Sequence, residues 1–151
     1  MDPALETAAL ETRGLAKRFG GIVATDSVSF RLERGARHAL IGPNGAGKTT
    51  FVNLLTGVLA PSAGRVLLEG NDVTRLRPEA RVRLGLVRTF QINQLFADLT
   101  PLETLALAVG ERLGHGATWN RSLGGEALAR EVEQVAARFG LADVLDVRSD
   151  T

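Results

Sequence analysis

The chain has 151 residues, of which 44% are hydrophobic and 23% charged, a composition typical of one soluble domain or a part of one. Its net charge of +1 disfavours general nucleic-acid binding, and the lack of cysteine excludes disulfides, thiolate metal sites and cysteine nucleophiles. The longest uncharged run, residues 49–64, contains Pro61 and is shorter than the roughly 20 apolar residues that a membrane span needs.

The first third of the chain predicts strands followed by a helix. Apolar and polar residues roughly alternate over residues 10–19 and 28–33, which is typical of strands with one exposed face, and Gly20-Gly21 between them predicts a turn. The short apolar run from Ala36 to Ile41 predicts a buried parallel strand. Residues 48–57 carry apolar side chains at helical spacing and predict a helix that ends at Gly57.

The remaining chain predicts two more strands and three helices. They are a strand over 64–70 with a turn at 70–72, a helix from Pro78 to Leu84, a strand over 86–90, a helix from Pro101 to Leu113 capped by Thr100, and a helix over 126–139. The last helix has an apolar stripe of Leu128, Val132, Val135, Ala136 and Phe139. This order predicts an α/β architecture with an antiparallel β-rich edge, a strand–loop–helix unit and a helical lobe.

The segment from Gly42 to Thr49 fits the phosphate-loop pattern GxxxxGK[ST] at every fixed position. Glycines allow the backbone conformations that turn successive N–H groups toward an anion, and the helix that follows points its N-terminus at the same anion. Lys48 is expected to reach the β- and γ-phosphates of ATP, and the Thr49 hydroxyl to ligate Mg²⁺. The predicted cofactors are therefore ATP and Mg²⁺. The predicted phosphate contacts are Gly42, Pro43, Asn44, Gly45, Ala46, Gly47, Lys48, Thr49 and Thr50.

Three stretches together extend this pattern: LAKRFGG before the loop, GPNGAGKTT in it, and GLVRTFQ after it. In this order and spacing they resemble the ATP-binding subunits of ABC transporters, especially those of branched-chain amino acid importers. The resemblance covers about residues 10–147. It implies a P-loop ATPase fold of the ABC type, with an antiparallel β subdomain, a partial parallel core sheet and a helical lobe. It also implies a single incomplete domain over residues 1–151, with the ATP-binding core at about 10–100 and the start of the helical subdomain at about 101–147.

The resemblance also assigns roles to residues outside the loop. Phe19 falls where the family places an aromatic side chain that stacks on adenine, with Val23 or Ala24 lining the same pocket; without the resemblance, Phe19 reads as a core or turn residue. Gln91 matches the glutamine that reaches Mg²⁺ and the attacking water, which makes Gln91 and Lys48 the expected catalytic residues. Leu95 and Phe96 are expected either to contact a membrane subunit or to pack inward on the helical lobe.

Two motifs of the family are not found in the sequence. Residues 122–125 (SLGG) only partly match the signature motif, LSGGQ. Residues 141–146 (LADVLD) are the best match to the Walker B strand, but Val147 follows them where the catalytic glutamate should stand. We therefore expect a truncated subunit that binds Mg²⁺·ATP weakly and hydrolyses it negligibly, because hydrolysis also needs a metal-holding carboxylate and a base.

For the intact transporter, the resemblance implies integral membrane permease subunits and a second ATPase subunit as partners. The chain itself is expected to be cytoplasmic and peripheral on the cell membrane, with no direct membrane insertion and no nucleic-acid partner. The alternatives are a DNA-repair ATPase of the same superfamily, a small nucleotide kinase or GTPase, and a complete binding-only module. A DNA-repair ATPase of this superfamily usually carries long coiled coils, and this sequence has no sustained heptads. A GTPase would carry the base-recognition motif NKxD, which is absent from the sequence.

Overall fold

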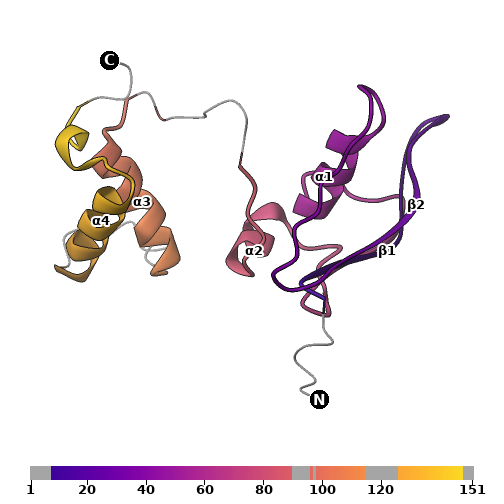
Figure 1. Cartoon of the computed structure of the whole chain (residues 1–151), viewed down its shortest axis with the longest axis horizontal. Coiled ribbons are helices and arrows are strands. Elements are labelled where there is room, and N and C mark those ends of the chain that lie inside the picture. Colours follow the sequence, from indigo (N-terminus) through magenta and orange to yellow (C-terminus); the bar gives the residue numbers. More distant parts are fainter. Residues whose placement is uncertain (1–7, 90–95, 97, 115–125, 148–151) are drawn as a thin grey trace. The chain divides into compact units, whose positions relative to one another are not determined.

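The computed structural model describes residues 8–89, 96, 98–114 and 126–147. The chain divides into two compact units, residues 1–89 and 90–151, and Figure 1 traces both along the sequence. The first unit contains the sheet and the phosphate loop, and the described part of the second contains two helices and a short 3₁₀ helix. Within the described ranges, no helix has the length and apolar character that crossing a membrane requires. Gln91 and Leu95, and residues 122–125, lie outside the described residues.

The sheet of the first unit is a four-stranded antiparallel sheet in the order β2-β1-β3-β4. Its strands are β1 (Leu10–Phe19), β2 (Ile22–Leu32), β3 (Ala63–Leu68) and β4 (Asn71–Asp72). The prediction for residues 10–19 is confirmed in full, as is the turn at Gly20-Gly21, and the strand predicted at 28–33 lies within a longer β2. The long β1–β2 hairpin is visible in Figure 1.

The turn between β3 and β4 lies one position earlier than predicted. The sequence predicts a turn over residues 70–72, whereas Leu68 pairs with Asn71, so Glu69 and Gly70 form the turn. Both have positive φ, 49° and 80°, as a two-residue turn of the hairpin type requires. Glutamate is uncommon at such a position, which is why the residue pattern did not indicate it.

Three helices complete the predicted pattern and each confirms its expected start. They are α1 (Lys48–Thr56), α3 (Pro101–Arg112) and α4 (Glu126–Arg138). Gly57 ends α1 with φ 81°, and Thr100 caps α3 through a reciprocal capping box with Glu103. The short helix α2 (Pro78–Arg83) also begins at the predicted proline.

The parallel strand predicted at residues 36–41 and the strand predicted at 86–90 are not formed by the described residues of these segments. Residues 36–41 have no strand pairing and are exposed, with Ile41 88% accessible, and residues 86–89 are also irregular. An apolar run forms a buried parallel strand only when neighbouring strands cover it on both sides and on its faces. Among the described residues no other strand pairs with these segments. Phe90, the last residue of the second predicted strand, lies outside the described residues.

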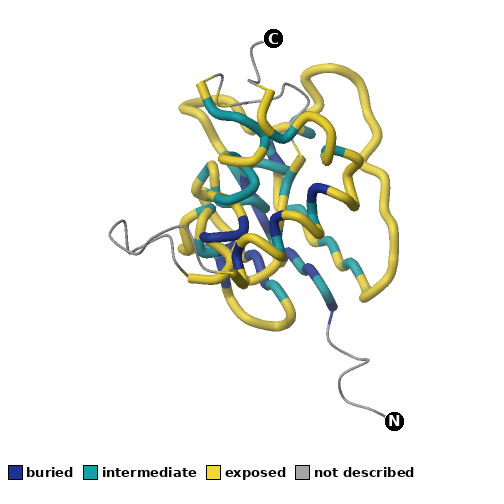
Figure 2. The backbone as a smooth tube through the Cα atoms, turned by 90° about the vertical axis from the view of Figure 1, so that its left-hand side faces the viewer, coloured by how far each residue is buried: buried dark blue, intermediate teal, exposed yellow. Residues whose placement is uncertain are grey.

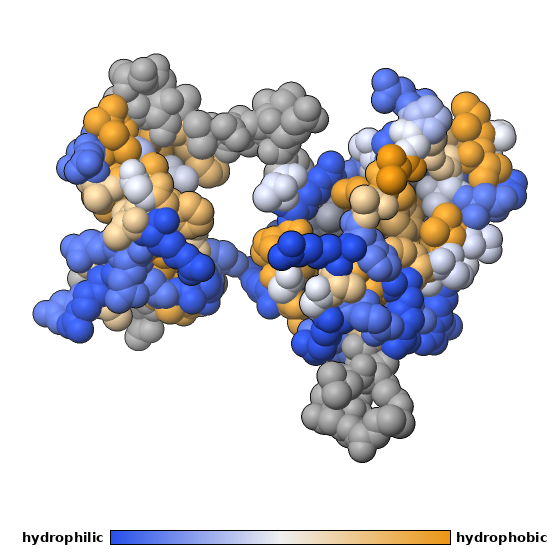
Figure 3. All heavy atoms as spheres, viewed as in Figure 1, coloured by the Kyte–Doolittle hydropathy of each residue, from blue (hydrophilic) through white to orange (hydrophobic). Residues whose placement is uncertain are grey.

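Each unit has its own apolar core. In the first, Leu15, Leu54 and Val66 are fully buried between the sheet and α1. In the second, Val109 of α3 packs with Leu128 and Val132 of α4. The apolar stripe of α4 is thus confirmed except at Phe139, which is 72% exposed because it follows the end of the helix. Figure 2 shows short buried stretches alternating with exposed ones, and Figure 3 shows apolar side chains on the surface as well.

Candidate phosphate-binding site

The phosphate loop joins the exposed segment 36–41 to the N-terminus of α1. Gly45 and Gly47 both have φ 82°, a left-handed conformation that disfavours residues with a Cβ. Gly47 is the N-cap of α1, and its carbonyl accepts the first helical hydrogen bond from the Phe51 N–H at 2.8 Å. Residues 42–46, which include Pro43, Asn44 and Ala46, are exposed. The loop therefore presents its backbone to solvent at the positive end of a helix dipole.

Gly47 has a second requirement, which is space. A Cβ at this position would lie 2.2 Å from the carbonyl oxygen of Ala24 in β2. The β1–β2 hairpin therefore lies directly against the phosphate loop at this point. The sequence indicated the conformational role of this glycine and contained no sign of the close approach by a strand 23 residues earlier.

We expect Gly47→Ala to lower the free energy of unfolding by about 2–4 kcal/mol, since the variant combines a left-handed alanine with a backbone clash. Gly45→Ala is the matched control, because Gly45 has the same φ of 82° and nothing lies within 4 Å of the position its Cβ would take. Urea unfolding followed by circular dichroism compares the two variants. Equal losses would show that the contact with Ala24 has no energetic weight.

Lys48 opens α1, and its ammonium folds back over the loop. Its Nζ donates hydrogen bonds to the carbonyl oxygens of Gly42 at 2.5 Å and Pro43 at 2.7 Å. Thr49, the predicted Mg²⁺ ligand, is exposed, and Thr50 is half-buried in the same first turn. A positive charge, a helix N-terminus and two left-handed glycines thus converge on one loop. This donor set fits a polyphosphate and a hydroxyl ligand for its Mg²⁺.

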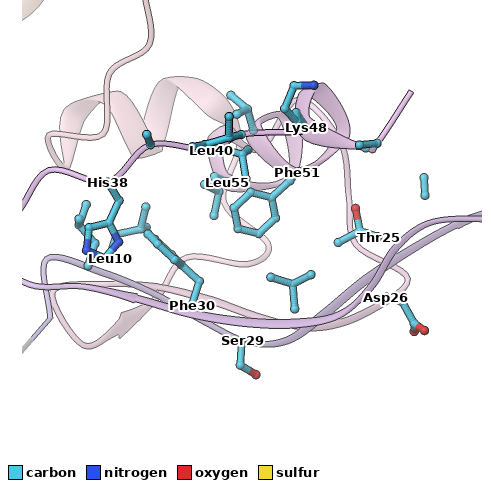
Figure 4. Close-up of a pocket in the computed structure, with 18 of the residues that line it drawn as sticks. Leu10, Thr25, Asp26, Ser29, Phe30, His38, Leu40, Lys48, Phe51 and Leu55 are labelled. Carbon is cyan, nitrogen blue, oxygen red and sulfur yellow. The ribbon is translucent and has the colours of Figure 1, made fainter. Parts of the chain in front are cut away.

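A cavity of about 800 Å³ lies beside the loop, between β2, residues 37–41 and α1. Figure 4 shows Phe51 of α1 and Phe30 of β2 among its apolar lining, with Lys48 at its edge. The two rings meet edge to face, with centroids 6.2 Å apart. His38, which lies within the segment 36–41, packs edge to face against Phe30 with ring centroids 5.3 Å apart. Ala46, Gly47 and Lys48 of the phosphate loop form one edge of this cavity, and the rest of its lining is mainly apolar.

The residues predicted to hold the base lie at the end of the β1–β2 hairpin. Phe19 is the last residue of β1 and is 47% exposed, so a face of its ring is accessible to a ligand. Phe19 pairs with Ile22, whereas Val23 pairs with Arg18. Because adjacent residues of a strand point to opposite faces, Val23 and Phe19 lie on different faces of the hairpin. Ala24 has no partner in this register, because the shift between Lys17 and Arg18 places an extra residue in β2, and its carbonyl oxygen lies against Gly47.

Sequence reasoning missed Arg81, a buried residue that fixes the other end of α1. Its guanidinium donates hydrogen bonds to the carbonyl oxygens of Leu54 at 2.9 Å and Leu55 at 2.6 Å, both in the last turns of the helix. It also donates to Thr74 at 2.9 Å and Leu76 at 3.1 Å. Burial lowers the pKa of Arg81 from its usual value, and the charge of Asp72 opposes this shift. An arginine on an amphipathic helix usually faces solvent, so the pattern gave no signal for this role.

Residues 25–151 match the family model described as ABC transporter. The chain belongs to the ABC transporter family. Among its relatives, this ABC transporter chain is 40% identical over 139 residues to a probable branched-chain amino acid transport ATP-binding protein LivG of Archaeoglobus fulgidus, covering 90% of this chain and 52% of the relative. It is 43% identical over 99 residues to the high-affinity branched-chain amino acid transport ATP-binding protein BraF of Pseudomonas aeruginosa, covering 66% and 39%.

A third relative is named for a different solute: the ribose import ATP-binding protein RbsA 1 of Mesorhizobium japonicum is 34% identical over 145 residues, covering 95% of this chain and 26% of the relative. Among solved structures, MJ1267, an ATP-binding cassette of an ABC transporter, has a TM-score of 0.75 and 30% identity, covering 95% of this chain and 59% of that one. The ABC transporter chain thus spans about half the length of the LivG relative. The similarity to the MJ1267 structure and the match to the family model together confirm the predicted ABC ATPase fold class.

Proposed function

We propose that this chain is the ATP-binding part of an ABC importer ATPase subunit that energises uptake of branched-chain or related amino acids. The geometry of the phosphate loop is the observation that carries the nucleotide part of this proposal. Two left-handed glycines and Lys48 meet at the N-terminus of α1. The amino acid part is supported by the functions for which the LivG and BraF relatives are named.

In this proposal each site residue has a defined task. Residues 42–50 surround the phosphates, Lys48 neutralises their charge, and Phe19 stacks on adenine. Thr49 and Gln91 hold Mg²⁺, which neutralises phosphate charge when bound. Arg88, three residues before Gln91, donates a hydrogen bond to Asn53 of α1 at 2.6 Å, which ties the segment leading to Gln91 to the phosphate-loop helix.

The proposed setting is that of the family. Residues 1–151 form part of one nucleotide-binding domain, with the ATP-binding core at about 10–100 and the helical subdomain beginning at about 101. The subunit works at the cytoplasmic face of the cell membrane through permease subunits, and pairs with a second ATPase subunit. Phe96 is 62% exposed, which supports a contact between Phe96 and a permease subunit. The 151 residues alone bind Mg²⁺·ATP and hydrolyse it negligibly.

Calorimetric titration of the 151-residue chain with Mg²⁺·ATP tests the proposal. We expect saturable binding that Lys48→Ala weakens roughly tenfold or more, because the variant removes a charged partner of the phosphates. Arg138→Ala, at an exposed position in the last turn of α4, is the charge-matched control and should leave the affinity unchanged. Phosphate release should not exceed that of Lys48→Ala. Equal affinity of the Lys48→Ala and unaltered chains would refute the proposed site, and turnover well above the variant would refute the proposed inactivity.

A further inference from the structure

Lys17 and Phe19 lie on the same face of β1 as the buried core. The register shift between Thr12 and Leu15 places one extra residue in β1, and the later shifts place the extra residues in β2. Alternation along β1 is therefore regular from Leu15 to Phe19, so Leu15, Lys17 and Phe19 share one face. Leu15 is fully buried in the core that includes α1. Lys17 and Phe19 thus continue that face toward the end of the hairpin.

The ammonium of Lys17 is held in place by two partners. Its Nζ lies 5.1 Å from the centroid of the Phe19 ring and donates a hydrogen bond to the carbonyl oxygen of Ala60 at 2.7 Å. Ala60 belongs to the connection that follows α1. The ammonium therefore covers one face of the ring, while Phe19 as a whole remains 47% exposed.

The end of β1 is also fixed to that connection through its backbone. Ser62 N–H donates to the Ala16 carbonyl at 2.8 Å, and Arg18 N–H donates to the Ser62 hydroxyl at 3.1 Å. On the neighbouring strand, Ala24 meets Gly47 of the phosphate loop. The hairpin end that carries Phe19 is thus anchored at the start of the phosphate-loop helix on one side and beyond its end on the other.

We propose that Lys17 is a positioning residue for the nucleotide base. Its ammonium holds the Phe19 ring in one orientation and occupies one face of it, so that the base stacks on the opposite face. This inference rests on the proposed function, because it needs a nucleotide whose phosphates lie on the loop. It adds a role for Lys17 that depends on the base and not on the phosphates.

The test compares Mg²⁺·ATP with Mg²⁺·tripolyphosphate, which has the phosphates and no base. We expect Lys17→Met, which keeps the apolar stem, to weaken ATP binding about two- to fivefold and to leave tripolyphosphate binding unchanged. Lys17→Arg should restore most of the ATP affinity, because a guanidinium can lie over the same ring. Binding of tripolyphosphate also reports whether each variant is folded.

A double-mutant cycle assigns the effect to the ring. Phe19→Ala should weaken ATP binding, and adding Lys17→Met to it should cause little further loss if the lysine acts through Phe19. Equal weakening of ATP and tripolyphosphate by Lys17→Met, additive losses in the cycle, or unchanged ATP affinity would each overturn the inference alone. Failure of the unaltered chain to bind either ligand would refute the proposed function, and the inference with it.

Discussion

Gly64→Ala is expected to unfold the first unit or to leave it barely stable. Gly64 has φ 85°, and a Cβ there would lie 2.2 Å from the Gly14 carbonyl oxygen and 2.6 Å from the Leu15 Cα. Both atoms belong to the backbone of β1, so relief requires β3 and β1 to separate and Leu15, which is fully buried, to move. We expect a loss of about 3–5 kcal/mol, a large part of the 5–15 kcal/mol typical of a domain.

Gly35→Ala is the matched control for this variant. Gly35 also has a left-handed φ, 76°, and nothing lies within 4 Å of the position its Cβ would take. It should lose only the conformational part, about 1–2 kcal/mol. Urea unfolding of the two variants separates the clash from the dihedral strain. A Gly64→Ala chain as stable as Gly35→Ala would mean that the two strands can move apart without cost, contrary to this structure.

Arg81→Met is expected to lower the free energy of unfolding by about 3–5 kcal/mol. Methionine keeps much of the apolar stem and removes the hydrogen bonds from Arg81 to the carbonyls of Leu54, Leu55, Thr74 and Leu76. The Leu54 carbonyl still accepts from the Gly57 N–H at 3.3 Å. Each buried carbonyl left without a donor costs about 1–3 kcal/mol before the structure relaxes. The variant also removes a positive charge from the C-terminal end of the α1 dipole. Denaturant unfolding measures the loss.

Two further variants make the Arg81 test specific. Arg77→Met removes an exposed arginine four residues earlier and should change stability by less than about 0.5 kcal/mol. Arg81→Lys keeps the charge and loses the planar fork that reaches four carbonyls, so we expect an intermediate loss. If Arg81→Met were no worse than Arg77→Met, the hydrogen bonds to α1 would not stabilise the fold.

The features that the sequence predicted well are those that depend on neighbours in the chain. Alternation gave the full extent of β1, and the glycine after Thr56 gave the end of α1, where Gly57 has φ 81°. Thr100, Pro101 and Glu103 gave the capped start of α3. Caps, turns and strand alternation are decided within a few residues, so their signals survive without knowledge of the fold.

The features that could not be predicted from the sequence depend on hydrogen bonds and packing supplied by other segments of the chain. Ala36–Ile41 has the composition of a buried strand, but a strand forms only where partners offer hydrogen bonds, and the described residues offer none. Arg81 became a buried cap because the last turns of α1 lie beside it. The pattern of apolar and charged residues indicates which secondary structure a segment favours, but it does not indicate which other segments pack beside it.

By itself, the sequence determined the phosphate-loop motif, the local helices and turns, and the resemblance to ABC ATPases, because each is written in a short run of residues. Only the tertiary structure decided that Ala24 presses on Gly47, that Arg81 holds the far end of α1, and that Lys17 covers one face of Phe19. The first two contacts join residues about 25 positions apart in the sequence. The third depends on the strand register and on the distant Ala60 carbonyl, which accepts a hydrogen bond from Lys17. They arise from packing, which no local pattern encodes.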